Sequence, residues 1–199
     1  MRHVVSEEWV TKYATYLEEA PGFRMQTPDY GLYNHMGATL TEAIAQQGLK
    51  WDAQVKPLVD RIRALPTART TSGFLSGPPV PRLVGYGFKG KAVERLARFF
   101  SARGVETEGD LRAWLADERH IPVLLAVRQV GPKTVDYLKN LVGIHGVAVD
   151  THIRRTAVAA GIPSKATYDQ LKELVEAVAA KFEVTSYVLD FSIWAWSAR

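Results

Sequence analysis

The sequence predicts an all-α protein. Apolar residues recur at helical spacing through most of the chain, as after Ser6, where Trp9, Tyr13 and Leu17 fall on one helix face. No stretch alternates apolar and polar residues for more than a few positions, which argues against a sheet. Proline and glycine punctuate the pattern where helices would end, as at Pro21. We therefore expect nine or ten helices.

The expected helices follow one another with short connections. Their approximate ranges are 6–20, 38–47, 52–64, 89–103, 109–117, 121–127, 133–142, 150–160, 167–182 and 184–197. The segment TTSGFLSGPPVP, residues 70–81, is rich in glycine and proline. It is expected to be a mobile loop or the crossing between two lobes.

The amino-acid composition excludes several classes of protein. A hydrophobic content of 47% with 10% aromatic residues is ample for a buried core. No apolar run approaches the roughly 18–20 residues that span a bilayer, and the acidic N-terminal segment does not resemble a signal peptide. An intracellular, cytoplasmic protein without a membrane partner is expected. Because cysteine is absent, disulfides, thiolate zinc sites and cysteine-ligated iron–sulfur clusters are excluded, and no metal or cofactor is expected.

Positive charge is concentrated in two stretches. Residues 82–103 carry six basic and one acidic side chain, and residues 121–155 carry five basic and two acidic. This is a modest footprint for a polyanion such as DNA, although a solvated helix face would explain the first stretch as well.

Residues 121–142 are expected to form a helix, a tight turn and a second helix. Pro122 and Pro132 each suit the first position of a helix, and Gly131 suits a turn residue with positive φ. The backbone N–H groups of such a hairpin can hold a phosphate. From periodicity alone, a helix pair of this kind is structural more often than DNA-binding.

Two charged residues stand at helix starts, 17 positions apart: Lys133 and Asp150. Local pattern alone makes Asp150 a helix N-cap and Lys133 a solvated first-turn lysine. The strings around them are more specific. VGPKT (130–134) followed by VAVDTHIRR (147–155) closely resembles the helix–hairpin–helix DNA glycosylases (HhH-GPD) of the endonuclease III superfamily. GFKGKAVERL (87–96) and, more weakly, AIAQQGLKW (43–51) extend the resemblance.

The resemblance implies a two-lobed helical glycosylase fold over residues 1–199 with DNA in the cleft between the lobes. One lobe would span about 25–160 with the hairpin at 121–142, and segments 1–24 and 160–199 would form the other. It implies catalytic roles for Lys133 and Asp150. It also implies DNA contacts from the hairpin and from a helix end, at Arg128, Gln129, Val130, Gly131 and Gln47.

The sequence departs from the family pattern in two places. Gln129 stands where the family usually has glycine, so the backbone is strained if that position needs positive φ. Arg128 could compensate through a phosphate contact. The C-terminal four-cysteine cluster of typical endonuclease III proteins is also missing, as it is in some branches, including the 8-oxoguanine glycosylases.

The implied function is a monomeric bifunctional DNA glycosylase and AP lyase in base excision repair. Its partner would be double-stranded DNA with a damaged base or an abasic site, and an oxidised base, with a slight preference for a purine, is the expected substrate. A lysine suits the chemistry because its amine can form a Schiff base, and a carboxylate stabilises an oxocarbenium-like state. The alternatives are a non-catalytic helix–hairpin–helix DNA-binding protein and a glycosylase with weak or no lyase activity.

Neighbouring polar residues have ordinary interpretations. His152 is expected to be a hydrogen-bonded structural residue rather than a base. Asp136 and Tyr137 are expected to pack or to lie at the surface. Gln46 and Trp51, like Gln47, could touch DNA or a flipped base, but core and loop positions are at least as well supported.

Overall fold

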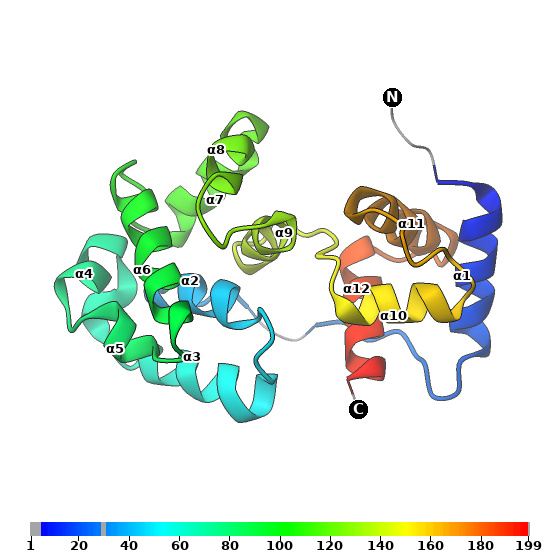
Figure 1. Cartoon of the computed structure of the whole chain (residues 1–199), viewed down its shortest axis with the longest axis horizontal. Helices are drawn as coiled ribbons and strands as arrows, with labels where there is room; N and C mark the ends of the chain where they lie inside the picture. The colour runs from blue at the N-terminus through cyan, green and yellow to red at the C-terminus, as the bar shows by residue number, and fades with distance from the viewer. Residues whose placement is uncertain (1–4, 29–30, 199) are drawn as a thin grey trace. The chain divides into compact units, whose positions relative to one another are not determined.

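The computed structural model describes residues 5–28 and 31–198 of the chain. Every regular element in these ranges is a helix, so the expected all-α class is confirmed (Figure 1). No helix in the described ranges is both long enough and apolar enough to cross a membrane.

The chain divides into two compact units. Unit 1 takes residues from 1–30 and 145–199, and unit 2 takes residues 31–144. The resemblance placed the boundaries near 25 and 160. The second boundary lies earlier because α10 (Thr151–Ala159) buries Ile153 and Ala157 in the core of unit 1.

Unit 1 joins the two ends of the chain. Its helices are α1 (Glu7–Glu19), α10, α11 (Tyr168–Lys181) and α12 (Ser186–Ser197). The Ser6 side chain caps α1 by accepting a hydrogen bond from Trp9 N, as the sequence predicts. α1 packs against α11 (Figure 1). The buried Tyr13 hydroxyl lies 2.7 Å from the Thr156 hydroxyl of α10.

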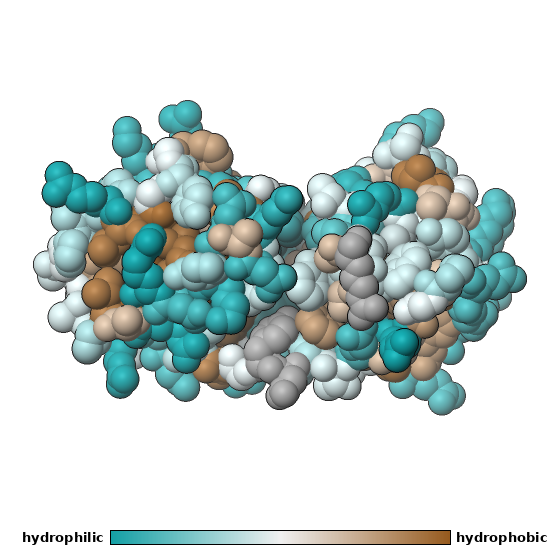
Figure 2. Space-filling view, turned by 90° about the horizontal axis from the view of Figure 1, so that it is seen from below, coloured by the Kyte–Doolittle hydropathy of each residue, from teal (hydrophilic) through white to brown (hydrophobic). Residues whose placement is uncertain are grey.

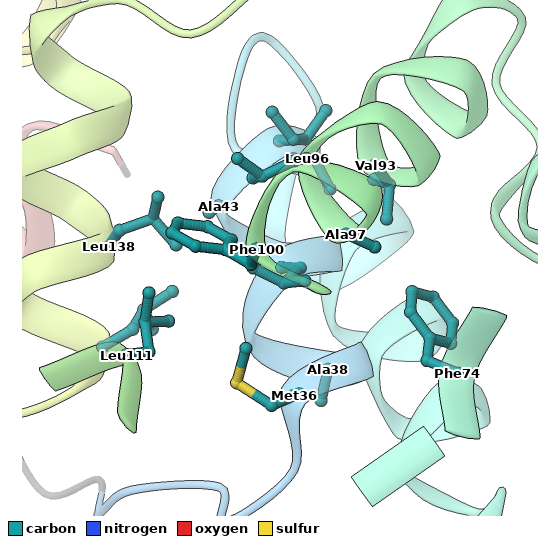
Figure 3. Packing of buried hydrophobic residues seen from close by; sticks show 14 of the residues in the cluster. Met36, Ala38, Ala43, Phe74, Val93, Leu96, Ala97, Phe100, Leu111 and Leu138 are labelled. Atoms are coloured by element: carbon teal, nitrogen blue, oxygen red, sulfur yellow. The ribbon is translucent and has the colours of Figure 1, made fainter. Parts of the chain in front are cut away.

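Unit 2 is built around α2 (Met36–Ala45), all of whose residues are buried. α6, α4 and α9 pack against it, and Phe100, Leu138 and Met36 come together in the core (Figure 3). The other elements are a π-helical turn (Trp51–Val55), α3 (Lys56–Arg63), a 3-10 turn (Pro66–Arg69), α4 (Thr71–Ser76), α5 (Val80–Val84), α6 (Phe88–Ser101), α7 (Glu108–Ala116), a second 3-10 turn (Glu118–His120), α8 (Ile121–Leu125) and α9 (Pro132–Leu141).

The expectation for residues 70–81 is wrong. Instead of a mobile loop or a lobe crossing, the segment forms α4 and the start of α5, entirely within unit 2. The Thr70 side chain caps α4 at Gly73 N, and Phe74 is buried in the core. α5 lies close against α6 because Gly90 has no side chain: a Cβ there would stand 2.6 Å from Pro81 Cα. Tertiary contacts therefore stabilise helices that local propensity disfavours.

Hydrophilic side chains cover much of the face that Figure 2 shows. A hydrophobic area is also visible on unit 2 in that view. The buried aliphatic and aromatic residues form one core in each unit.

Candidate functional site

The hairpin expected at 121–142 is present as α8, a turn over residues 126–131 and α9. Val130 N donates to Val127 O at 2.9 Å and closes the turn. The residue with positive φ is Gln129, at +73°, whereas Gly131 is extended at φ −114°. The expectation of positive φ at Gly131 is therefore wrong, because the reversal of the chain occurs two residues earlier.

Gln129 is held in this left-handed conformation by contacts on both sides. Its side-chain Oε1 accepts from Arg95 Nη1 at 3.1 Å, and its backbone carbonyl accepts from Gln47 Nε2 at 3.0 Å. Arg95 also donates to the Arg128 carbonyl. A non-glycine residue at such a φ costs about 1–2 kcal/mol, and these hydrogen bonds offset part of that cost.

The strain at Gln129 is measurable with two variants. We expect Gln129→Gly to be more stable than Gln129→Ala, with a free energy of unfolding about 1 kcal/mol higher. Both variants lose the Arg95 contact, so their difference isolates the backbone conformation. Urea unfolding of the two proteins checks it, and equal stabilities would mean that the turn does not hold a left-handed residue.

The N-terminus of α9 is open. Gly131 is its N-cap and provides no side chain to satisfy the first N–H groups. No acceptor within the described ranges takes a hydrogen bond from Lys133 N or Thr134 N. A Cβ built on Gly131 would meet nothing within 4 Å. Uncapped N–H groups at the positive end of a helix dipole, next to free space, are suited to bind an anion such as phosphate.

The Lys133 side chain is half-buried and turns toward the C-terminal end of α2. Its Nζ lies 3.5 Å from the carbonyl oxygen of Gln46, which is the C-cap residue of α2. Tyr137, one turn further along α9, donates its hydroxyl to the Glu42 carboxylate. Tyr137 and the buried Asp136 are thus part of the packing of α9 within unit 2.

Gln47 joins the end of α2 to the hairpin. Its Nε2 donates to the Gln129 carbonyl and, at 2.9 Å, to the Thr134 hydroxyl. This side chain therefore supports the turn, and its amide N–H groups are engaged within the protein. Trp51 packs, partly buried, against the core of unit 2.

Lys89 was not singled out from the sequence, but it lies at the same place. It is 5% exposed, and its Nζ donates to the carbonyls of Gln47 and, at 3.5 Å, Ile44. Burial and, second, the charge of Lys133 lower the pKa of Lys89. The only feature of the sequence that could have indicated Lys89 is its position between two glycines in GFKGK.

Glu42 is a second residue that the sequence did not reveal. It is 2% exposed and accepts hydrogen bonds from the hydroxyls of Tyr33 and Tyr137. Burial raises the pKa of the Glu42 carboxyl, while those hydroxyls and the Gln46 side chain act in the opposite direction. The hydrogen bonds of this enclosed carboxyl group hold the C-terminal end of α2 in place. The Gln46 carbonyl, near which Lys133 Nζ lies, is at that end.

Asp150 belongs to unit 1, where it is the N-cap of α10 as the sequence predicts. Its Oδ1 accepts from His152 N at 2.8 Å and Ile153 N at 3.0 Å. No hydrogen bond to Oδ2 is donated from the described residues, so capping occupies one carboxylate oxygen and leaves the other available. His152 Nδ1 lies 2.8 Å from the Ser197 hydroxyl, which agrees with a structural role.

Residues 80–198 match the model of a family described as a domain of unknown function, DUF8548. That match covers more than half of the chain. The chain belongs to this family. A comparison with curated proteins found no match.

The DUF8548 match begins at α5 and includes the hairpin, Lys89, Lys133 and Asp150. Glu42 and Gln47 lie outside it, on and just after α2. In this DUF8548 protein, the surroundings of Lys133 are thus completed by residues that precede the matched region.

Within residues 5–28 and 31–198, no three or more histidine, aspartate, glutamate or cysteine side chains are grouped so that they could hold an ion. The polar groups gathered around Lys133 are instead amides, carbonyls and a second amine.

Proposed function

We propose that this protein is a bifunctional DNA glycosylase and AP lyase of the helix–hairpin–helix type. The proposal depends on one observation: Lys133 is the second residue of α9, whose N-terminus has no capping side chain. The hairpin that holds it has a sequence that resembles that family's. The open N–H groups would bind the DNA backbone, and the Lys133 amine beside them would react with the sugar of the same strand.

DNA binding would use backbone groups first. The N–H groups near Gly131 are suited to a phosphate because a helix N-terminus attracts anions without regard to base sequence. Two basic residues lie at the same turn: Arg128, and Arg95 of α6, which donates to the Arg128 carbonyl. Such contacts make the affinity for DNA fall steeply as salt rises.

An aromatic loop of unit 2 adds a surface for bases. Gly85, Tyr86 and Gly87 have φ values of +68°, +53° and +60°, so three successive residues are left-handed. This backbone holds Tyr86 and Phe88 42% and 56% exposed, next in sequence to Lys89. Exposed rings can stack on bases that have lost their partners, as happens when a nucleotide is flipped out of the duplex.

The proposed chemistry uses the amine of Lys133. The neutral amine attacks C1′ of the damaged nucleotide, and the bond from C1′ to the base breaks, so that the base leaves with the electron pair and gains a proton. Opening of the sugar ring gives a Schiff base, and loss of a C2′ proton then expels the 3′ phosphate. The resemblance assigns the carboxylate that stabilises the oxocarbenium-like state to Asp150.

A panel of duplex oligonucleotides tests the proposal. Each duplex carries one oxidised purine, oxidised pyrimidine or abasic site, and base release and strand nicking are scored separately. We expect release of an oxidised base followed by nicking, with a covalent adduct trapped by borohydride. Base release without nicking would indicate a glycosylase with weak or no lyase activity. Failure on every duplex would overturn the proposal.

The Gly131→Ala variant tests DNA binding by the hairpin in a protein that should still fold. Because a Cβ at Gly131 meets nothing within 4 Å, we expect the free energy of unfolding to fall by no more than about 1 kcal/mol, the cost of alanine in place of glycine at an N-cap. A phosphate on the adjoining N–H groups would be crowded by that methyl group, so affinity for duplex DNA should fall by about tenfold, a loss near 1.4 kcal/mol. Fluorescence anisotropy at fixed salt measures the affinity.

The matched control for this variant is Gly146→Ala, in unit 1, where a Cβ also meets nothing within 4 Å. Its DNA affinity should equal that of the wild type. Unchanged affinity in Gly131→Ala would mean that the hairpin does not hold the backbone.

A further inference from the structure

A closed set of hydrogen bonds ties the hairpin turn to two other elements of unit 2. Arg95 of α6 donates to the Gln129 side chain at 3.1 Å, and Gln47, just after α2, donates to the Gln129 carbonyl at 3.0 Å. Lys89, also on α6, donates to the Gln47 carbonyl at 2.5 Å. Because Arg95 and Lys89 belong to one helix, the chain of contacts returns to its start. This hairpin ring of Lys89, Gln47, Gln129 and Arg95 joins α6, the end of α2 and the turn.

The hairpin ring closes on the strained residue of the turn. Gln129 has a φ of +73°, a conformation that glycine adopts freely and that a residue with a Cβ adopts at a cost. With local forces alone, a glutamine at this position would favour negative φ, and the turn would open. The ring binds Gln129 at both its carbonyl and its side chain, so it supports the φ that a glycine would adopt without help.

The conformation of the turn sets the start of α9. Val130 N donates to Val127 O and closes the turn immediately before Gly131, the N-cap of α9. The direction in which the first N–H groups of α9 point therefore follows from the turn. Gln47 also donates to the Thr134 hydroxyl at 2.9 Å, so its amide contacts both the turn and the first turn of the helix.

Lys89 anchors the backbone of Gln47 from inside unit 2. Lys89 is 5% exposed, and its amine also lies 3.5 Å from the Ile44 carbonyl. Two carbonyls at the end of α2 are thus held by one buried amine. Because a buried donor that loses its acceptors is costly, Gln47 cannot readily follow a turn that relaxes, and its amide stays where the left-handed Gln129 meets it.

We propose that Gln47 is a positioning residue for DNA binding: within the hairpin ring, its amide holds Gln129 left-handed and keeps the uncapped N–H groups of α9 directed at a phosphate. This inference rests on the proposed function for its ligand, the DNA backbone. It gives Gln47 a different role from the one that the resemblance implies, since the amide acts on the hairpin rather than on the duplex. The hold on the turn is a property of the free protein, and it is testable without DNA.

Gln47→Met tests the inference. Methionine has a similar length and no amide, and the net charge is unchanged, so the electrostatic attraction to DNA stays the same. Loss of the two hydrogen bonds from the amide should lower the fraction of molecules with a left-handed turn, and the apparent affinity falls with that fraction. We expect DNA affinity to fall by about tenfold, measured by fluorescence anisotropy at fixed salt.

The same substitution in a Gln129→Gly background is the decisive comparison. Glycine adopts positive φ without a steric penalty, so the turn no longer needs the Gln47 amide, and affinity should change by less than about twofold. Gln129→Gly alone should bind DNA within about twofold of wild type for the same reason.

The matched control is Gln170→Met in unit 1, which removes an amide that accepts a hydrogen bond from Thr167 N. Its DNA affinity should equal that of the wild type. Circular dichroism confirms that each variant is folded.

Amide hydrogen exchange at Val130, followed by NMR, is the readout without DNA. This N–H closes the turn at 2.9 Å from Val127 O, so its exchange reports how often the turn opens. We expect exchange about tenfold faster in Gln47→Met and close to the wild-type rate once Gln129→Gly is added.

An equal loss of affinity in both backgrounds would mean that Gln47 contacts DNA itself, and the inference would fail. Unchanged affinity in Gln47→Met, with or without faster exchange at Val130, would overturn it too, while the proposed function stands if wild type reacts with damaged duplexes. If wild type binds no DNA but exchange at Val130 responds as expected, the proposed function fails and the hold of the ring on the turn stands.

Discussion

Lys133→Gln is expected to abolish the borohydride-trapped adduct and to reduce strand nicking at an abasic site by at least about 10³-fold, the scale on which loss of a nucleophile acts. The amine is the group proposed to form the Schiff base, and an amide nitrogen cannot replace it. Glutamine retains a donor for the Gln46 carbonyl, on which Lys133 Nζ lies at 3.5 Å, so the fold should be preserved. Denaturing gel electrophoresis after borohydride treatment measures the adduct.

The matched control is Lys165→Gln, which removes an exposed lysine of unit 1. It should trap and nick like the wild type. An adduct that persists in Lys133→Gln would assign the nucleophile to another amine. If the wild type binds DNA with strong salt dependence but never reacts, the protein is a non-catalytic helix–hairpin–helix DNA-binding protein.

Asp150→Asn is expected to slow base release by about 10²–10³-fold, because it removes the negative charge proposed to stabilise the oxocarbenium-like state. Asparagine is as good an N-cap as aspartate, so the hydrogen bonds from His152 N and Ile153 N can be kept. The expected result is therefore a slow but folded protein. Single-turnover base release, with DNA affinity measured in parallel, checks it.

Asp150→Ala provides the comparison, since it removes charge and cap together. It should lose about 1 kcal/mol of stability that Asp150→Asn retains. Wild-type base release in the asparagine variant would mean that Asp150 serves α10 as a cap and has no part in the chemistry. Weak DNA binding in that variant would likewise point to a structural role.

The helices and their caps were largely predictable from the sequence. The segment expected at 89–103 is α6, and Asp150 is the cap expected at the start of α10. These features depend on residues within four positions of one another, because a helix is closed by bonds from each N–H to the fourth carbonyl before it. The hairpin at 121–142 was predictable for the same reason.

Handedness in the turn was predictable only in part. Local sequence suggested positive φ at Gly131, whereas the resemblance indicated Gln129 as the position that would be strained by positive φ. The structure has positive φ at Gln129, which Arg95 and Gln47 hold from elsewhere in unit 2. The helices in residues 70–81 were not predictable from local sequence either, because its composition favours loops. The burial of Phe74 and the close approach of α5 to α6 at Gly90 stabilise them.

By itself, the sequence determined that this protein is all-helical, that Lys133 and Asp150 stand at two helix starts, and that their surroundings resemble a glycosylase. Only the tertiary structure decided what surrounds the lysine. Lys89 lies more than 40 residues from the α2 carbonyls that it contacts, and the sequence around it resembles that of an exposed basic helix. Burial depends on which distant segments pack together, and no local pattern contains that information.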